Sequence, residues 1–132
     1  MTSRLQSSVK ANCKRYKMNR KEKGQRAVRE CIQRFFSGER YLVGDVEKSH
    51  QYATQRDLFG IGDLIVLDKY ENRIILVQVT CNRPHRHIDY MNFYRDWCTT
   101  GIEVEQYVRY DRKGWKKFIY FEDEKICEII SS

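Results

Sequence analysis

The sequence predicts a single α/β domain in which helices and short strands alternate. Two runs rich in Ile, Val and Leu, at residues 64–67 and 73–80, flank a turn-like stretch at 68–72. Each run is too short for a helix with a core face, so both are expected to be buried strands. Residues 24–37 and 88–98 instead repeat apolar side chains at helical spacing. A chain of 132 residues has the usual length of one domain.

Basic residues outnumber acidic ones, and the excess is concentrated at the start of the chain. The sequence holds 25 Lys and Arg residues against 18 Asp and Glu residues, a net charge of +7. We expect residues 1–22 to form a basic arm and residues 23–132 to form one domain. Such an arm gains affinity for a nucleic-acid backbone by releasing counterions, although a solvated tail would have the same composition. The basic residues expected to contact nucleic acid here are Lys14, Arg15, Lys21 and Lys23.

The first helix is expected at residues 24–37, with Gly38 as its C-cap. Glu30 lies at the rim of its apolar face, where it could form an ion pair with Arg26 or Arg34 at helical spacing. The apolar face is expected to contain Ala27, Val28, Cys31, Ile32 and Phe35.

Two strands are expected after this helix, at residues 41–47 and 63–68, lying next to each other. The polar loop between them carries Lys48, a further candidate for a phosphate contact. Glycines at two of the three positions before Asp63 would let the backbone or a ligand approach this carboxylate closely.

Polar residues stand at adjoining ends of the two central strands. Asp63 opens one strand, and Gln78 and Thr80 close the next. In an antiparallel hairpin the start of the first strand lies beside the end of the second, so Asp63 and Gln78 can meet. Gln78 and Thr80 are two residues apart and therefore point to the same face. A carboxylate, an amide and a hydroxyl are thus expected to converge at one edge of the sheet.

A basic stretch follows directly after these polar residues. Arg83, His85 and Arg86 are expected to contact phosphate, and Pro84 marks a turn before the second helix. His85 and His87 are separated by one residue, but no third ligand is spaced to complete a zinc site.

The second helix is expected at residues 88–98, with Ile88, Met91, Tyr94 or Phe93, and Trp97 in the core. Strands at 103–110 and 116–121 follow, joined by a hairpin turn at 111–114. Residues 126–130 form an apolar tail that would add a short strand or a dimer contact.

Five cysteines without any C-x-x-C pair are typical of a reduced, intracellular protein, and we expect each to be a small apolar filler. No signal peptide and no stretch long enough to span a membrane are visible.

The Asp63, Gln78 and Thr80 pattern resembles the PD-(D/E)XK nuclease superfamily. Its signature is an Asp at a strand start, followed by an acid-x-Lys at the end of the neighbouring strand. The sequence has Gln78 at the acidic position and Thr80 at the lysine position. The likeness covers roughly residues 20–120 and is closest to Holliday-junction-resolvase-like members from phages or archaea, which carry Asp-Leu-Phe-Gly before the Asp and end in Gln-Val-Thr.

This resemblance implies a three-layer restriction-endonuclease-like fold with an αβββαβ core, in which helices flank a mixed central sheet. It implies a DNA endonuclease that uses Mg²⁺ or Mn²⁺, acts on branched or repair-intermediate DNA and works as a homodimer. Asp63, Gln78 and the Val79 carbonyl would hold the metal, and Glu30 would hold it through water. Thr80 removes the usual cation, which Lys48 or one of the arginines after the strand would replace.

Three other interpretations are open from the sequence. The chain could bind nucleic acid on the same fold without cutting it, as the missing lysine favours. Its basic face could contact RNA or an acidic protein in an assembly. Finally, Asp63 could simply cap a strand turn, as Asp residues do in ordinary folds.

Overall fold

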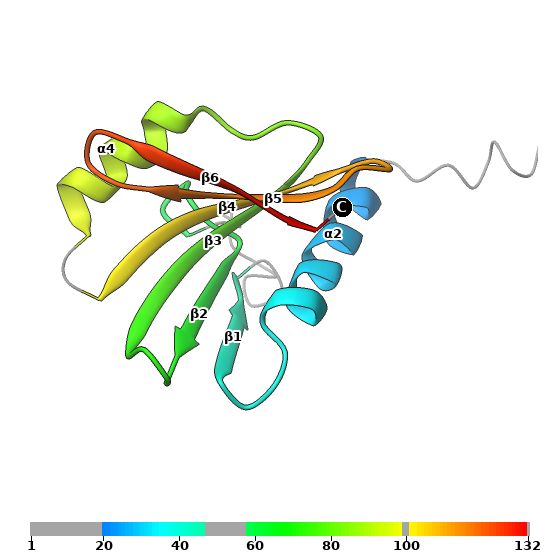
Figure 1. Ribbon diagram of the computed structural model, residues 1–132, viewed down its shortest axis with the longest axis horizontal. Helices are drawn as coiled ribbons and strands as arrows, with labels where there is room; N and C mark the ends of the chain where they lie inside the picture. Colours follow the sequence, from blue (N-terminus) through cyan, green and yellow to red (C-terminus); the bar gives the residue numbers. More distant parts are fainter. Residues whose placement is uncertain (1–19, 47–57, 99–100, 132) are drawn as a thin grey trace, which may run out of the picture.

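The protein folds into one six-stranded sheet with two helices, which confirms the expected α/β class (Figure 1). The computed structural model describes residues 20–46, 58–98 and 101–131. The elements are α2 (Arg20–Phe35), β1 (Tyr41–Asp45), β2 (Leu64–Asp68), β3 (Arg73–Cys81), α4 (His87–Trp97), β4 (Ile102–Tyr110), β5 (Gly114–Tyr120) and β6 (Lys125–Ser131).

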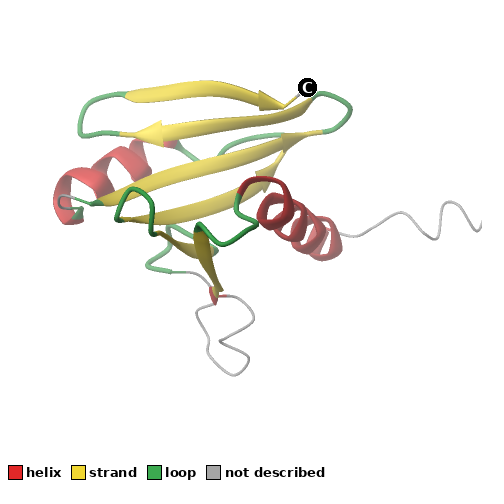
Figure 2. Cartoon of the chain, turned by 60° about the horizontal axis from the view of Figure 1, so that its bottom comes forward, coloured by secondary structure: helices red, strands yellow, loops and turns green. Residues whose placement is uncertain are grey.

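The six strands lie in the sheet in the order in which they occur in the sequence. β1, β2 and β3 pair antiparallel, β3 and β4 pair parallel, and β5 and β6 continue antiparallel from β4. The parallel pair requires a crossover, and α4 provides it. The sheet is therefore mixed, and its strands are visible side by side in Figure 2.

The two helices cover opposite faces of the sheet. Residues of β4 belong to two separate apolar clusters, Tyr107 to one and Val104 and Val108 to the other, as expected when successive side chains point to opposite faces. The cluster under α2 contains Ala27, Val28, Cys31, Phe36, Leu64, Val66, Ile75, Val77, Val79, Tyr107 and Trp115. The cluster under α4 contains Ile61, Tyr90, Val104, Val108, Phe118 and Tyr120.

Helix α2 begins earlier and ends earlier than the sequence predicts. Its first residue is Arg20, so the helix includes residues 20–22, which we had assigned to the basic arm. Lys and Arg have good helix propensity and do not oppose this extension. Beyond the end of the helix, Gly38 has a φ of 97°, which a glycine adopts without strain. The predicted apolar face of α2 is confirmed.

Helix α4 packs on its aromatic residues in a way that differs from the prediction. Tyr90 is its buried residue, and Met91, Phe93 and Tyr94 pack against the same cluster. Ile88 and Trp97 are exposed, so placing them in the core was wrong. The helical spacing of apolar residues predicts a core position, whereas Trp97 lines an open recess with residues of β2 and β3. Neither described helix is long and apolar enough to cross a membrane.

The end of the hairpin remote from Asp63 is fixed by a buried carboxylate. Asp68 is only 2% exposed and accepts hydrogen bonds from Arg40 at 2.9 and 2.8 Å and from Arg73 at 2.9 Å. These bonds, that of Arg40 foremost, hold the pKa of the Asp68 carboxyl well below its usual range. The network stabilises the register in which Asp68 of β2 pairs with Arg73 of β3. The same register places Asp63 beside the end of β3.

The apolar tail at residues 126–130 forms a strand, which is one of the two outcomes expected from the sequence. Residues of β6 pair antiparallel with β5 and extend the sheet at that edge. The described cysteines are free thiols. Cys31 is buried, as a filler should be, but Cys127 on β6 is exposed, which contradicts that expectation.

Candidate functional site

Asp63 is held at the point where β2 meets β3. Its backbone N–H donates to the Val77 carbonyl at 2.8 Å, and its own carbonyl accepts from Val46 at 3.0 Å. A Cβ added at Gly62 would lie 3.2 Å from the Val77 carbonyl oxygen. The backbone therefore comes close to β3 at this point because residue 62 is a glycine, as the sequence predicted.

The side chains of Asp63 and Gln78 meet, as the hairpin argument predicts. Gln78 Nε2 donates to Asp63 Oδ2 at 2.7 Å, and the Val79 N–H donates to the same oxygen at 3.1 Å. Gln78 Nε2 also lies 3.3 Å from the Val79 carbonyl oxygen. Gln78 is 7% exposed and Asp63 is half-buried, so these contacts are partly shielded from water.

The orientation of the Gln78 amide follows from its neighbours. Both groups that face it, the Asp63 carboxylate and the Val79 carbonyl, can only accept hydrogen bonds. An amide oxygen at this point would be repelled by both, so the nitrogen faces them. The expectation that the Gln78 oxygen and the Asp63 carboxylate face one point is therefore not met in this conformation.

The same three groups can supply oxygen ligands to a divalent ion. Asp63 Oδ2 and the Val79 carbonyl oxygen surround the position of Gln78 Nε2. A half-turn of the amide would replace that nitrogen by Oε1. Mg²⁺ prefers oxygen ligands and is often bound by one or two carboxylates together with water and substrate phosphate. The residues thus fit a weak Mg²⁺ or Mn²⁺ site with a single negative charge.

No family model matches the sequence. No curated protein matches it either. The site is consequently interpreted from its own geometry. Across residues 20–46, 58–98 and 101–131, no three His, Cys, Asp or Glu side chains gather as a metal-binding group.

Thr80 is one of the residues that line a recess beside this point. Its Oγ1 is buried and has no hydrogen-bond partner within the described part of the chain. Such an atom costs free energy until a partner reaches it. The recess is lined by residues 23, 24 and 79–85, which include Lys23, Arg83 and His85. Three residues predicted to contact nucleic acid thus share one recess with Thr80.

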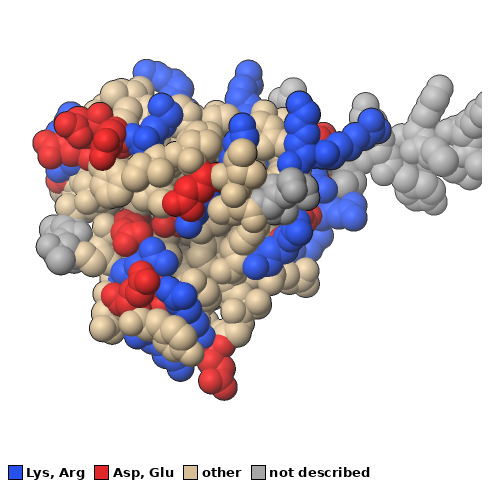
Figure 3. All heavy atoms as spheres, in the orientation of Figure 1, with Lys and Arg blue, Asp and Glu red and all other residues tan. Residues whose placement is uncertain are grey.

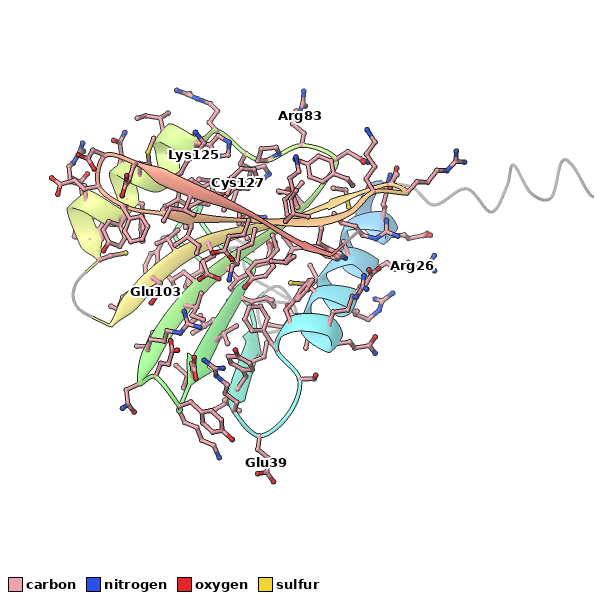
Figure 4. All side chains as sticks on the ribbon, in the orientation of Figure 1. Arg26, Glu39, Arg83, Glu103, Lys125 and Cys127 are labelled. Atoms are coloured by element: carbon pink, nitrogen blue, oxygen red, sulfur yellow. The ribbon has the colours of Figure 1, made fainter. Side chains whose placement is uncertain are left out.

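A second recess adjoins the first along the connection between β3 and α4. It is lined by Gly60, by residues 83–87, by Asp89 and by Tyr90. Arg83 to His85 belong to both recesses, and Arg86 belongs to the second. Figure 4 shows Arg83 pointing outward from this connection.

Two histidines of this connection are positioned by residues that the sequence did not reveal. His85 Nδ1 lies 3.1 Å from the Tyr90 hydroxyl, and His87 Nδ1 lies 2.6 Å from the Tyr120 hydroxyl. Gln106, which is fully buried, accepts from the His85 N–H at 2.9 Å and donates to the His85 carbonyl at 3.1 Å. Its Nε2 also donates to the Tyr120 hydroxyl at 2.7 Å.

These contacts favour one position for the proton of His87. The Tyr120 hydroxyl accepts from Gln106, and its single hydrogen is available to His87 Nδ1. The arrangement in which the hydroxyl donates to Nδ1 places the imidazole proton on Nε2. Burial, reinforced by the charge of Lys125, lowers the pKa of His87 below its ordinary value. His87 is thus a neutral donor beside the second recess.

Glu30 belongs to a different network. Its carboxylate accepts from Trp115 Nε1 at 2.9 Å and from Arg109 at 3.1 Å, and it pairs with Arg34 at 3.4 Å. Burial alone would raise the pKa of Glu30, but the Trp115 and Arg109 hydrogen bonds lower it overall. The predicted ion pair with Arg34 is confirmed. A role of Glu30 in holding a metal finds no support in these contacts.

The other predicted nucleic-acid contacts are placed only in part. Lys14, Arg15 and Lys48 lie outside the described residues, and Lys21 is in the first turn of α2. Lys23, two residues further along, lies 2.9 Å from Asp111 Oδ2. Figure 3 shows Lys and Arg side chains gathered on the side of the molecule where α2 lies.

Proposed function

We propose that the protein is a metal-dependent endonuclease that hydrolyses phosphodiester bonds in DNA. The observation that carries this proposal is the convergence of Asp63 Oδ2 and the Val79 carbonyl on one point within reach of the Gln78 side chain. Mg²⁺ or Mn²⁺ is the cofactor that such oxygen donors suit. The resemblance to PD-(D/E)XK nucleases rests on the same residues.

The arrangement of the sheet supports the restriction-endonuclease-like fold that this function implies. Three antiparallel strands are followed by a helix and a fourth strand that runs parallel to the third. With α2 in front, the order of elements is αβββαβ. β5 and β6 extend this core at the edge formed by β4.

Each residue of the site has a definite part in the proposed reaction. Asp63, Gln78 through Oε1 and Val79 through its carbonyl would hold the ion. When bound, such an ion lowers the pKa of its water and neutralises charge on the phosphate. Lys23 and Arg83 would donate to the phosphate from the adjoining recess, which Thr80 also lines. These two cations take the place of the lysine that the superfamily pattern has at position 80.

The substrate is proposed to be DNA, and specifically branched or repair-intermediate DNA. The net charge of +7 and the basic surface around α2 support a polyanionic partner. The recesses offer donors for phosphate groups, which DNA and RNA share, so the experiment below includes both nucleic acids.

Binding of nucleic acid without cleavage is the second candidate. It is favoured by the single carboxylate of the site and by the Gln78 nitrogen, which is the group that faces Asp63. This candidate predicts salt-sensitive binding that needs no metal.

A homodimer is also proposed. The lining of an apolar recess beside α4 contains no charged residue: Leu58, Phe59, Ile65, Leu67, Ile74, Leu76, Phe93, Trp97, Cys98 and Ile102. Phe59 is 70% exposed and Trp97 is 73% exposed. Because each copy carries a charge of +7, an uncharged surface is where a second copy meets the least repulsion.

The experiment is cleavage of supercoiled plasmid, a four-way DNA junction and a matched RNA duplex with Mg²⁺ or Mn²⁺. Asp63→Ala is compared with Asp123→Ala, an exposed acid in the β5–β6 turn. We expect metal-dependent cutting that only Asp63→Ala abolishes. Absence of cutting by the wild type, with nucleic-acid binding intact in EDTA, would replace this proposal by the second candidate.

A further inference from the structure

We propose that the Gln78 amide group occupies the cation position until a phosphate arrives, so that divalent-ion binding is coupled to nucleic-acid binding. This inference rests on the proposed function, because it concerns the same site. It adds that the orientation of the Gln78 amide controls whether the ion can bind. A glutamate at this position would give a site that fills without nucleic acid.

The two oxygens that an ion would use already face hydrogen-bond donors. Asp63 Oδ2 accepts two hydrogen bonds, from Gln78 Nε2 at 2.7 Å and from the Val79 N–H at 3.1 Å. The same Nε2 lies 3.3 Å from the Val79 carbonyl oxygen. The –NH₂ group therefore supplies partial positive charge to both oxygens that an ion would use. An entering ion must displace it.

The second step concerns charge. Asp63 is the carboxylate that Gln78 contacts at this point, and Gln78 is neutral. Lys23, which is paired with Asp111 at 2.9 Å, and Arg83 line the recess that adjoins it. An ion entering alone gains attraction from one carboxylate, loses the Gln78 hydrogen bond and meets nearby positive charge. Its affinity for the protein alone is consequently low.

The third step is what a phosphate changes. A phosphate in the recess would lie against Thr80, whose buried Oγ1 lacks a hydrogen-bond partner within the described part of the chain. It would also offset the charge of Arg83 and compete with Asp111 for Lys23. Its oxygens add negative charge and ligands beside Asp63, which makes turning the amide favourable. By linkage, the ion then strengthens nucleic-acid binding by the same factor.

The test measures Mn²⁺ binding by electron paramagnetic resonance, without reference to cleavage. Wild type, Gln78→Glu and Gln33→Glu, an exposed control on α2, are titrated with Mn²⁺ alone and with a 20-bp duplex. Asp63→Ala with the same duplex gives the background of Mn²⁺ held by DNA. Cleavage of the duplex does not disturb the measurement, because the phosphates remain.

We expect the duplex to raise the Mn²⁺ affinity of the wild type by about tenfold or more, within the usual range of coupling between sites. Gln78→Glu should bind Mn²⁺ without DNA, and Gln33→Glu should behave as the wild type. The inference is overturned if the wild type binds Mn²⁺ equally with and without the duplex, if it binds none in either case, or if folded Gln78→Glu gains nothing.

A second measurement needs no variant. The side-chain NH₂ resonances of Gln78 should keep their positions when Mg²⁺ is added alone, and shift when Mg²⁺ and the duplex are added together. A shift with Mg²⁺ alone, or none with both, contradicts the inference. A protein that shows coupling but never cuts would contradict the proposed function alone. A protein that cuts yet binds Mn²⁺ equally without DNA would contradict only this inference.

Discussion

Gln106 and His85 form two hydrogen bonds with each other in opposite directions. The His85 N–H donates to Gln106 Oε1 at 2.9 Å, and Gln106 Nε2 donates to the His85 carbonyl at 3.1 Å. A side chain at the centre of the sheet thereby holds the backbone of the connection that lines both recesses. Strand β4, the parallel neighbour of β3, therefore positions the connection between β3 and α4.

Gln106→Leu should lower the free energy of unfolding by about 2–3 kcal/mol, since it leaves the His85 backbone and the Tyr120 hydroxyl without their partner. Gln33→Leu, at an exposed site on α2, is the control and should change stability by no more than about 0.5 kcal/mol. Urea denaturation measures both. Equal stabilities of the two variants would show that Gln106 does not hold the connection.

His87 should be neutral at pH 7, with its proton on Nε2. Two-dimensional ¹H–¹⁵N spectroscopy distinguishes the tautomers, and Tyr120→Phe should remove the preference because the donor to Nδ1 is lost. A proton on Nδ1 in the wild type would contradict the arrangement. Lys125→Gln should raise the pKa of His87, because the nearby positive charge contributes to its depression.

The same depressed pKa predicts how stability depends on pH. The unfolded chain binds the His87 proton more tightly than the folded protein does, so protonation favours unfolding. Stability should therefore fall as the pH drops below the ordinary value of 6.5 and through the lowered pKa of the folded state. His87→Asn should flatten this part of the stability curve. An unchanged curve would mean that His87 does not contribute to it.

Glu30→Gln should leave metal-dependent cleavage intact and reduce stability. The carboxylate accepts from Trp115 and Arg109, and a neutral amide oxygen replaces only part of this. We expect a loss of about 1–2 kcal/mol, which thermal unfolding followed by Trp fluorescence would report. Loss of cleavage as complete as in Asp63→Ala would instead show that Glu30 serves the metal.

Lys23→Gln and Arg83→Gln should each weaken nucleic-acid binding and reduce the slope of log K against log salt by about 0.9, as expected for one lost phosphate contact. Lys69→Gln is the control, because Lys69 is exposed and lies at the end of β2 remote from Asp63. Fluorescence anisotropy at several salt concentrations measures the slopes. Identical slopes for all three variants would exclude a phosphate at this recess.

Trp97→Arg should convert a dimer to a monomer, because it places a charge in the uncharged recess beside α4. Ile129→Arg is the matched control, since Ile129 is 74% exposed on β6, outside this recess. Sedimentation velocity reports the mass of each. A wild type that is monomeric at all concentrations would contradict the homodimer.

The meeting of Asp63 and Gln78 could be predicted from sequence because it needs only a hairpin and the two-residue period of strands. The role of Gln106 could not be predicted from the sequence. Residues 104–108 are all buried, since β4 is covered on both faces, and alternation therefore carried no signal. The exposure of Trp97 could not be predicted either, because an apolar residue at helical spacing gives no sign that it lines an open recess.

The most direct measurement is a crystal structure of the protein with a short DNA duplex and Mn²⁺. The account predicts an anomalous peak that bridges Asp63, the Val79 carbonyl and a phosphate oxygen, with Gln78 turned so that Oε1 faces the ion. A structure with DNA bound and Gln78 Nε2 still on Asp63, without a peak at that point, would contradict it.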